Sequence, residues 1–429
     1  MSEQKFATTL DDAYFNFEIG EPLPAGSPFY VRRQDKVVSK LKRILLRAKG
    51  KASVPRYLFS GHTGSGKSTE LQKIADSSDI NDAYWPVLIS LRKHADINDI
   101  DYTDVFFVIA SQLFIAYKET GNLKKHDQLL EDIERWEGTF IKEVVIQEGD
   151  HTTKEFNAAI KAGIVELTSK FKKEPRAKEI IRKRVELHIG ALVDNINELG
   201  TIILAHEGKR PLIIIDDLDK ASLADSREIF ISRQSTIMDI NLPVIYAISS
   251  TLFYDPAFPS RKGIQEIFLP NIKLHEECSD VRVSEGYMLL RNFVHARMEP
   301  ELISEDALEL AMKMSGGVFR ELVRIMQDSI DYALGEERER VEIEDVEQSV
   351  TDIRNVYWRI LTQTHIDILD DIRACIPTRN DTETMAALLK MLAILEYNGS
   401  GRWFDVHPAL YKLLDEFKRE AERRQSRAS

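Results

Sequence analysis

Residues 56–76 read RYLFSGHTGSGKSTELQKIAD. A short apolar run leads directly into a glycine-rich loop, and helical spacing of the apolar residues follows from Thr69. The loop, Gly61–Thr69, fits the pattern G-x-x-x-x-G-K-[ST], in which the glycines let the backbone curl so that its N–H groups point at phosphate oxygens. The strand before it and the helix after it are the setting that this pattern requires. The stretch therefore predicts a phosphate loop at the end of a buried strand.

Every residue of this loop is a candidate nucleotide contact: Gly61, His62, Thr63, Gly64, Ser65, Gly66, Lys67, Ser68 and Thr69. Lys67 is expected to reach the β and γ phosphates of ATP, and the hydroxyl of Ser68 to bind Mg²⁺. The N-terminus of the following helix adds a partial positive charge. The alternative interpretation is a chance glycine loop at a strand-to-helix turn, and the length of the agreement in the right setting argues against it.

A second signal is an apolar strand that ends in adjacent carboxylates, PLIIIDDLDK at 211–220. In phosphate-loop sites Mg²⁺ is held by the loop hydroxyl and by an aspartate at the end of a neighbouring strand, so Asp216 is the predicted metal ligand. Asp217 is then placed to polarise the attacking water and is the candidate base, although aspartate is one methylene shorter than glutamate. Aspartates after a strand also cap turns. Asp219 and Lys220 are expected to form a surface turn.

Buried strands alternate with helical segments over the first two thirds of the chain, with further strands expected at 84–91, 242–250 and 264–274. This alternation predicts an α/β fold with a parallel sheet covered on both faces. Between the apolar helix that starts at Asp104 and the strand at 211, however, lie roughly 90 residues of charged helical pattern, where a crossover needs only about a dozen. A helical insertion is therefore expected at about 120–205.

The last part of the insertion is predicted to be a helical hairpin, with apolar stripes over 156–171 and 181–196 and with Pro175 at the turn. Around its tip, KFKKEPRAKEIIRKR at 170–184 contains eight basic and two acidic residues. Such a tip either grips a phosphate backbone or is a solvated helix end, and the sequence leaves both open.

No strand pattern occurs between Val283 and Val350; amphipathic helices are expected, with Ser304 as an N-cap and Gly316–Gly317 as a helix stop. After them come two further helices and a hairpin signal, Asn398-Gly399, which together suggest a winged helix. The expected organisation is a lead-in at 1–27, a P-loop ATPase domain at 28–278 that carries the insertion, a helical lid at 279–352 and a winged-helix-like domain at 353–429.

The net charge of −12 disfavours nonspecific coating of nucleic acid, because phosphate binding needs concentrated positive charge. No run of about 18 apolar residues is present, so no membrane span is expected. The two cysteines, Cys278 and Cys375, are far apart in the sequence without metal-ligand spacing, and the N-terminus lacks the pattern of a signal peptide. These features favour a cytoplasmic protein.

Together these motifs resemble the AAA+ ATPases, in the branch that contains the origin-recognition initiators, over about residues 28–350. The resemblance implies ATP and Mg²⁺ as ligands and a homo-oligomer as the working form. It implies that Tyr30, Val31 and Arg33 of "FYVRRQDKVVSKL" help to enclose the adenine. "AISST" would supply the polar sensor residue, as Ser249 or Ser250.

The resemblance also implies two arginine roles. "SGGVFRELVRI" is similar to the lid motif whose arginine touches the γ phosphate, here Arg320. An arginine donated to a neighbouring subunit would be Arg261, with Arg233 as the alternative. Two features depart from the pattern: Asp217 stands where a glutamate is usual, and "DDLD" also resembles the signal-transducing STAND ATPases, whose proline-bearing lid motif this chain lacks.

The predicted function is a Mg²⁺-dependent ATPase that couples its nucleotide state to assembly or to partner or DNA binding. The alternative is a slow nucleotide-gated switch that binds proteins, in a stress or phage-defence complex, without DNA binding. A third possibility is that ATP is only a structural ligand. The winged-helix candidate offers few basic residues, Lys390 on its helix and Arg402 on its wing, so a protein partner is preferred over DNA there.

Overall fold

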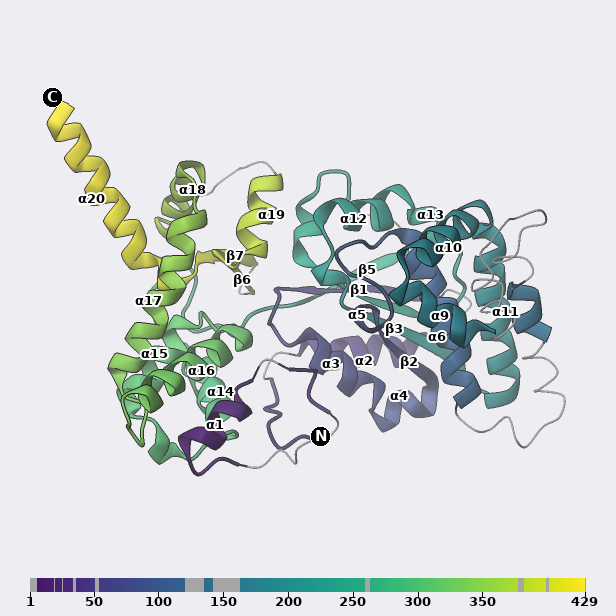
Figure 1. The fold of residues 1–429 in the computed structure, drawn as a ribbon, viewed down its shortest axis with the longest axis horizontal. Coiled ribbons are helices and arrows are strands. Elements are labelled where there is room, and N and C mark those ends of the chain that lie inside the picture. The colour runs from purple at the N-terminus through teal and green to yellow at the C-terminus, as the bar shows by residue number, and fades with distance from the viewer. Residues whose placement is uncertain are drawn as a thin grey trace. The chain divides into compact units, whose positions relative to one another are not determined.

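The computed structural model describes residues 6–18, 20–24, 26–33, 36–50, 54–119, 135–141, 163–258, 263–376, 382–398 and 401–428. The chain divides into two compact units, each made of separate stretches of sequence. The sheet unit comprises Val37–Ser60 and Glu70–Ile267, and the lid unit comprises Met1–Lys36, Gly61–Thr69 and Phe268–Ser429. The phosphate loop thus groups with the C-terminal half of the chain. Figure 1 locates the elements of both units by label and colour.

The sheet has five strands in the order β2-β3-β4-β1-β5. Their bounds are β1 Arg56–Gly61, β2 Tyr84–Ser90, β3 Arg210–Asp216, β4 Val244–Ser249 and β5 Ile264–Leu269. The central strand β3 pairs in parallel with β2 and with β4, and all its residues after Arg210 are buried. Its unbroken apolar run is typical of a strand covered on both faces. The prediction of a parallel α/β sheet is confirmed.

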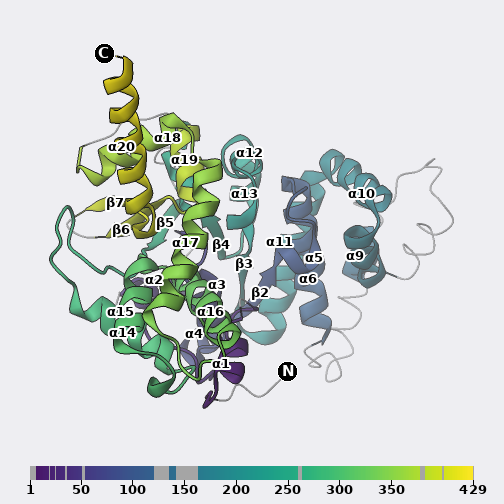
Figure 2. The ribbon, with the colours of Figure 1, turned by 60° about the vertical axis from the view of Figure 1, so that its left-hand side comes forward.

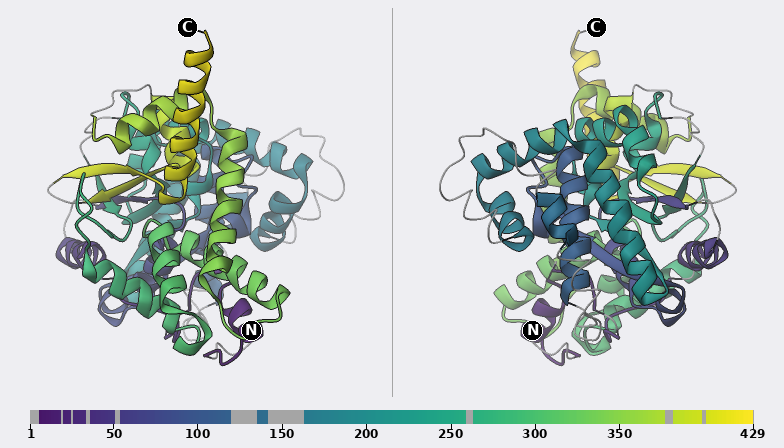
Figure 3. Two further views of the ribbon diagram at one scale, coloured as in Figure 1. Left: turned by 90° about the vertical axis from the view of Figure 1, so that its left-hand side faces the viewer. Right: turned by 90° about the vertical axis from the view of Figure 1, so that its right-hand side faces the viewer.

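The helices of the sheet unit are α2 Val37–Ala48, α3 Lys67–Ala75, α4 Ser78–Ala83, α5 Leu91–His94, α6 Tyr102–Glu119, α9 Ile164–Lys173, α10 Pro175–Leu187, α11 Ile189–Glu207, α12 Leu223–Arg227 and α13 Gln234–Asp239. The long helices α6 and α11 lie side by side, α6 against β2 and α11 against β3. Figure 3 (right) shows them as neighbouring blue and teal helices. Aromatic rings stack against α6: Trp136 lies between Phe114 of that helix and Phe140.

The insertion differs from the predicted hairpin in two respects. Its second stripe was expected to form one helix, but the helix breaks at His188, which ends α10 and precedes α11. Pro175 is the first residue of α10 rather than the turn itself, because proline lacks the N–H that a first helical position does not need. The start of the first stripe, Phe156 and Ile160, lies outside the described residues. Figure 2 shows α9 and α10 beside α5 and α6.

Of the helices of the lid unit, four begin between Val283 and Val350, where three or four were expected: α14 Ser284–His295, α15 Glu305–Met314, α16 Phe319–Gly335 and α17 Ile343–Ile360. The predicted N-cap is confirmed, because the Ser304 side chain accepts a hydrogen bond from the Ala307 N–H. The predicted helix stop is confirmed as well. Gly316 and Gly317 have φ of +56° and +74°, which glycine adopts without strain, and α16 begins two residues later.

The expected lead-in is not wholly irregular. Leu10–Asn16 forms helix α1, capped by the side chain of Thr9, which accepts a hydrogen bond from the Asp12 N–H. Leu10, Ala13 and Phe17 are buried at helical spacing, and α1 packs against α16. This stripe of three residues is too short to be distinguished from loop sequence by periodicity alone.

The C-terminal region consists of α18 Gln363–Arg373, α19 Thr382–Lys390, β6 Ile394–Asn398, β7 Arg402–Val406 and α20 Tyr411–Ala428. The strands form the predicted antiparallel hairpin, with Asn398 opposite Arg402; Gly399 lies outside the described residues. Figure 3 (left) shows the hairpin in yellow. Trp403 is buried and stacks on Tyr397, with ring centroids 4.7 Å apart. Helices followed by a hairpin give the predicted winged-helix-like arrangement.

Cys278 and Cys375 form a disulfide within the lid unit, with their Cα atoms 5.9 Å apart. The sequence analysis did not foresee this pairing, because 97 residues separate the two positions. The bond joins the segment that leads into α14 to the end of α18. Among the described residues, no helix is both long and apolar enough to cross a membrane.

Candidate nucleotide site

The predicted phosphate loop is formed by the turn between β1 and α3. Gly64 and Gly66 have φ of +85° and +95°, a conformation that side-chain-bearing residues rarely adopt. Helix α3 begins at Lys67, so the N–H groups of its first turn lie at the end of the loop. The loop is therefore a tight turn that leads directly into a helix N-terminus, an arrangement that favours anion binding.

The Lys67 side chain folds back over its own loop. The residue is buried, and its Nζ donates hydrogen bonds to the carbonyl oxygens of Gly61, at 2.9 Å, and His62, at 2.8 Å. These bonds hold the ammonium group on the inner side of the loop. A cation fixed there, next to a helix N-terminus, favours binding of an anion.

Arg33 braces the phosphate loop from the N-terminal segment. Its buried guanidinium donates from Nη1 to the Ser65 carbonyl oxygen, at 2.7 Å, and from Nη2 to that of Pro270. It also lies 5.7 Å from the ring centre of Phe319. The structure thus brings this predicted site residue to the loop, while Tyr30 and Val31 lie half-buried just before it.

The start of helix α16 contacts the phosphate loop. The backbone N–H of Arg320 donates to the Gly64 carbonyl oxygen, at 3.3 Å. A Cβ on Gly64 would come within 2.4 Å of the Arg320 Cβ, and one on Gly66 within 3.6 Å of the Phe319 ring. The predicted lid arginine and the predicted phosphate loop, more than 250 residues apart in the chain, are therefore neighbours in the lid unit.

His62 has a contact that the sequence analysis missed. It was a candidate only as a member of the loop, but its Nε2 accepts a hydrogen bond from the backbone N–H of Glu396 in β6, at 2.8 Å. Burial, and then the charge of Lys67, lower the pKa of His62 to about 3. No local signal could reveal this contact, since 334 residues separate the two partners.

The acidic end of β3 lies in the sheet unit. Asp216 is its last residue, is buried, and is paired in register with Ser90 of β2. Asp217 follows with a φ of +76°, an uncommon conformation for a residue with a side chain. The turn predicted for Asp219 and Lys220 is present as a 3-10 turn over Leu218–Lys220.

Both carboxylate oxygens of Asp217 have partners. Oδ2 accepts a hydrogen bond from the Ser90 hydroxyl, at 2.5 Å, and Oδ1 forms an ion pair with Lys220. Burial raises the pKa of this carboxyl, but the bonds from Lys220 and Ser90 outweigh burial and hold the pKa below its ordinary value. The role of Lys220 was not predicted, since the sequence suggested only a surface turn.

The structure shows the surroundings of both candidates for the polar sensor residue and of one candidate for the arginine donated to a neighbouring subunit. The hydroxyl of Ser249, at the end of β4, accepts hydrogen bonds from the N–H and hydroxyl of Thr251 and so caps a 3-10 turn, while Ser250 is buried. Arg261 lies outside the described residues. Arg233 forms an ion pair with Glu228 and covers the ring of Tyr102.

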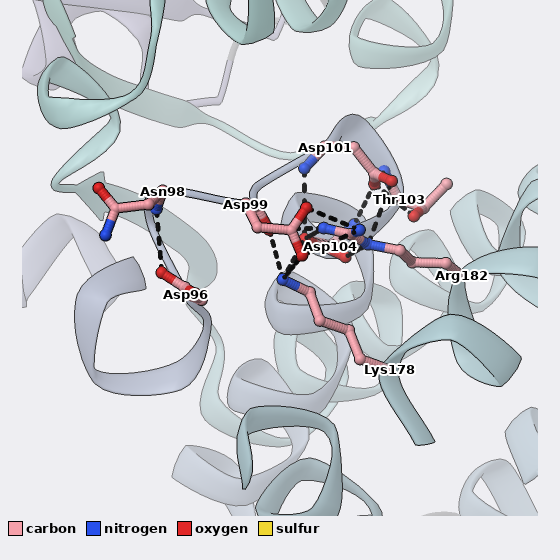
Figure 4. A network of polar contacts seen from close by, with 8 residues as sticks. All are labelled: Asp96, Asn98, Asp99, Asp101, Thr103, Asp104, Lys178 and Arg182. Atoms are coloured by element: carbon pink, nitrogen blue, oxygen red, sulfur yellow. Dashed lines mark hydrogen bonds and ion pairs between the residues drawn. The ribbon is translucent and has the colours of Figure 1, made fainter. Parts of the chain in front are cut away.

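The basic tip of the insertion is partly neutralised within the protein. Figure 4 shows Lys178 and Arg182 of α10 reaching an acidic turn before and at the start of α6. Arg182 donates to both oxygens of the fully buried Asp104, and both basic side chains pair with Asp99. Two further ion pairs, Lys170–Glu174 and Lys183–Glu179, lie along the helices. Acids outside the tip therefore balance Lys178 and Arg182, while Lys170 and Lys183 pair with glutamates of the tip itself.

A five-stranded parallel sheet with a phosphate loop after β1 and an acidic end on β3, followed by a four-helix lid and a winged-helix-like region, is the architecture of the AAA+ P-loop ATPases. No protein-family model matches the chain, and no curated protein sequence matches it either.

Solved structures with a similar fold include Cdc6p from Pyrobaculum aerophilum, with 13% identity and a TM-score of 0.43 over 96% of this chain and 99% of that one. The ORC1 protein of Aeropyrum pernix, solved in complex with DNA, has 13% identity and a TM-score of 0.41, with 94% and 96% covered. The RuvB Holliday junction branch migration motor of Thermotoga maritima has 14% identity and a TM-score of 0.37, with 89% and 95% covered. At these values, function has to be argued from this chain's own residues.

Proposed function

We propose that this protein is a Mg²⁺-dependent ATPase of the AAA+ type, in which nucleotide binding at Gly61–Thr69 controls assembly and partner binding. The observation that carries the proposal is the bond from the Arg320 N–H to the Gly64 carbonyl oxygen, at 3.3 Å. It brings a lid arginine to a loop whose backbone and lysine already have the form of an anion site. A chance glycine loop would have no reason to meet such an arginine.

The chain's own residues would bind ATP mainly through charge. The loop N–H groups and Lys67 would donate hydrogen bonds to the β and γ phosphates, and Arg320, whose backbone N–H bonds to Gly64, would contact the γ phosphate. Ser68 and Asp216 would hold Mg²⁺, because a hydroxyl and a carboxylate are the oxygen ligands that this ion prefers. When bound, Mg²⁺ neutralises charge that develops on the phosphate oxygens. In the same proposal, Tyr30, Val31 and Arg33 enclose the adenine, Ser250 is the sensor and Arg261 reaches a neighbouring subunit.

Hydrolysis is expected to be slow, which favours the nucleotide-gated switch among the candidate functions. Asp217, the base candidate at this strand end, binds Ser90 and Lys220 with its two oxygens and has a lowered pKa. A carboxylate held in this way is a weaker base for water. A glutamate would reach one methylene further.

We further propose protein partners and a homo-oligomer in the cytoplasm. DNA is a weaker candidate, because Lys178 and Arg182 of the basic tip around 170–184 are already paired with the protein's own acids. A duplex titration at low salt tests this point. Salt-sensitive binding together with DNA-stimulated ATP turnover would support the hypothesis that the protein binds DNA. In that case Arg261→Ala is expected to abolish the stimulation.

The main test is Lys67→Ala in a titration with a fluorescent ATP analogue, with and without Mg²⁺. Wild type is expected to bind, and the variant to lose at least about tenfold in affinity, since a charged hydrogen bond contributes about 1.5–3 kcal/mol. Lys73→Ala, in the last turn of the same helix α3, is the control. Circular dichroism checks folding. Equal affinities for wild type and Lys67→Ala would contradict the proposed site.

A further inference from the structure

The second residue of the phosphate loop is held by the winged-helix-like region. The Nε2 atom of His62 accepts the Glu396 N–H in β6, at 2.8 Å. The ring also has a backbone hydrogen bond with Leu389 in α19. The His62 side chain is buried, so these contacts are shielded from water. A loop with the sequence of a phosphate site is thus bonded directly to the hairpin and the helix before it.

The protonation state of His62 makes this link durable. Burial and the charge of Lys67 lower the pKa of the ring to about 3, and the backbone hydrogen bond with Leu389 only partly opposes that shift. The imidazole is therefore neutral at pH 7. A neutral imidazole has one nitrogen that accepts and one that donates, so it can accept the Glu396 N–H.

A second route joins the same loop to the same strand. The Arg320 N–H bonds to Gly64, and Val318, two residues before Arg320, packs with Leu395 and Tyr397 of β6. The Tyr397 hydroxyl donates to the Gly316 carbonyl oxygen, at 2.6 Å. Loop, lid turn and β6 therefore form a closed circuit. A shift in the position of one segment therefore requires the other two to shift as well, because the residues between them are closely packed.

We propose that the β6–β7 hairpin responds to nucleotide and that His62 is the positioning residue that links it to the phosphate loop. The proposal rests on the proposed function, since it requires nucleotide to bind at Gly61–Thr69. Phosphates that recruit the loop N–H groups shift the backbone around His62, and its ring transmits this shift to Glu396. The hairpin would then present a different surface to a protein partner in each nucleotide state.

Hydrogen exchange followed by mass spectrometry tests the link on the full chain. Peptides that cover residues 392–398 are compared without nucleotide, with ADP and with a non-hydrolysable ATP analogue, each at a saturating concentration established by fluorescence titration for every variant. In wild type we expect nucleotide to change exchange in these peptides by about tenfold, the scale of one buried hydrogen bond. The nucleotide-dependent change should vanish in His62→Ala, which removes the acceptor.

Two more variants separate a link from a merely structural role. His62→Gln supplies an amide oxygen as acceptor and should restore the nucleotide-dependent change. Tyr397→Phe cuts the second route at Gly316 and should reduce the change without abolishing it. A saturated wild type whose hairpin exchange does not change would overturn the inference, as would an unaltered response in His62→Ala. If wild type binds no nucleotide, the titration shows this first, and the proposed function fails together with the inference.

Discussion

At the scale of single residues, the candidate site depends on partners that lie far away in the sequence. Asp217 is held by Ser90 of β2, 127 residues away, as well as by the nearby Lys220, and His62 is held by the backbone of β6. Each contact changes the chemistry of the residue. Asp217 becomes a fixed, ionised carboxylate, and His62 becomes a neutral hydrogen-bond acceptor. Both residues were identified from motifs, but the motifs did not predict these states.

Asp217→Asn should destabilise the fold in a pH-dependent manner. The folded-state pKa of Asp217 lies below its ordinary value of 3.8, so the carboxylate stabilises the fold above that pH, and the contribution is lost as pH falls through the folded-state pKa. At pH 7 we expect a loss of about 1–3 kcal/mol, because Lys220 and Ser90 lose a charged partner. Urea unfolding from pH 7 to pH 3 measures it. Asp219→Asn, in the same turn, is the control, and a pH-independent difference would contradict the assignment.

The same variants test the proposed chemistry. If Asp217 polarises water, turnover in Asp217→Asn should fall by at least about a hundredfold, the lower range of general base catalysis. Asp217→Glu should be faster than wild type, since it adds the reach that glutamate has. Equal rates for wild type and Asp217→Asn, in steady-state phosphate release, would remove Asp217 from catalysis.

At the scale of elements, tight backbone approaches and buried ion pairs decide how helices dock. A Cβ on Gly317 would come within 1.8 Å of the Ile272 carbonyl oxygen, and Ile272 donates its N–H to Gly317. The double-glycine turn therefore ends α15. It also allows the chain at Ile272 to pack closely against the turn that leads into α16. In the sheet unit, the buried carboxylate of Asp104 plays a comparable part by holding α10 against α6.

Gly317→Ala should lower stability, because its φ of +74° and the Ile272 carbonyl both exclude a side chain. A loss of about 2 kcal/mol or more is expected, from backbone strain plus displacement of the neighbouring chain. Gly335→Ala is the control, since no atom lies within 4 Å of a Cβ there and the residue ends helix α16. That variant should be neutral or slightly stabilising. Thermal unfolding of both variants checks the contrast, which equal melting temperatures would refute.

Asp104→Ala should release the insertion. Removing one partner of a buried ion pair leaves the other charge uncompensated, at a cost of about 3–5 kcal/mol. Lys178 and Arg182 would be left facing the gap, although Asp99 and Asp101 would partly compensate. We expect faster proteolysis within α9–α11 than in wild type. Glu179→Ala removes an exposed pair on α10 and should leave proteolysis unchanged, as surface pairs contribute little.

At the scale of the whole molecule, the chain is organised by long-range closures. The disulfide joins Cys278 to Cys375 across 97 residues, and the phosphate loop is grouped with residues of the C-terminal half. A cross-link of this span restricts the unfolded chain strongly. The disulfide also argues against the proposed cytoplasmic location, because disulfides persist mainly in oxidising compartments.

Reduction should therefore lower the melting temperature of the purified protein, with a stability loss of about 2–4 kcal/mol. The double variant Cys278→Ser, Cys375→Ser should have the melting temperature of the reduced wild type, and added reductant should not change that temperature. Mass spectrometry of alkylated wild type reports the state of the pair. No effect of reductant on an oxidised wild type would show that the bond carries no stability.

Much of this protein follows from local sequence. The phosphate loop, the acidic strand end, the alternation of buried strands with helices, the Ser304 cap and the double-glycine stop all depend on residues within a few positions of one another. Backbone conformation and hydrophobic periodicity act over that range. They were enough to predict the sheet, the lid helices, the hairpin and the identity of the loop residues.

Tertiary structure decided which distant segments meet. Sequence could not tell that Lys178 and Arg182 pair with the buried Asp104 rather than face solvent, that Ser90 binds Asp217, that the two cysteines pair, or that His62 contacts β6. These contacts form only when separate elements pack against each other. The charge or composition of one segment does not identify the segment that it will contact. The sequence by itself thus determined the local form of the glycine-rich loop, and packing decided what that loop is connected to.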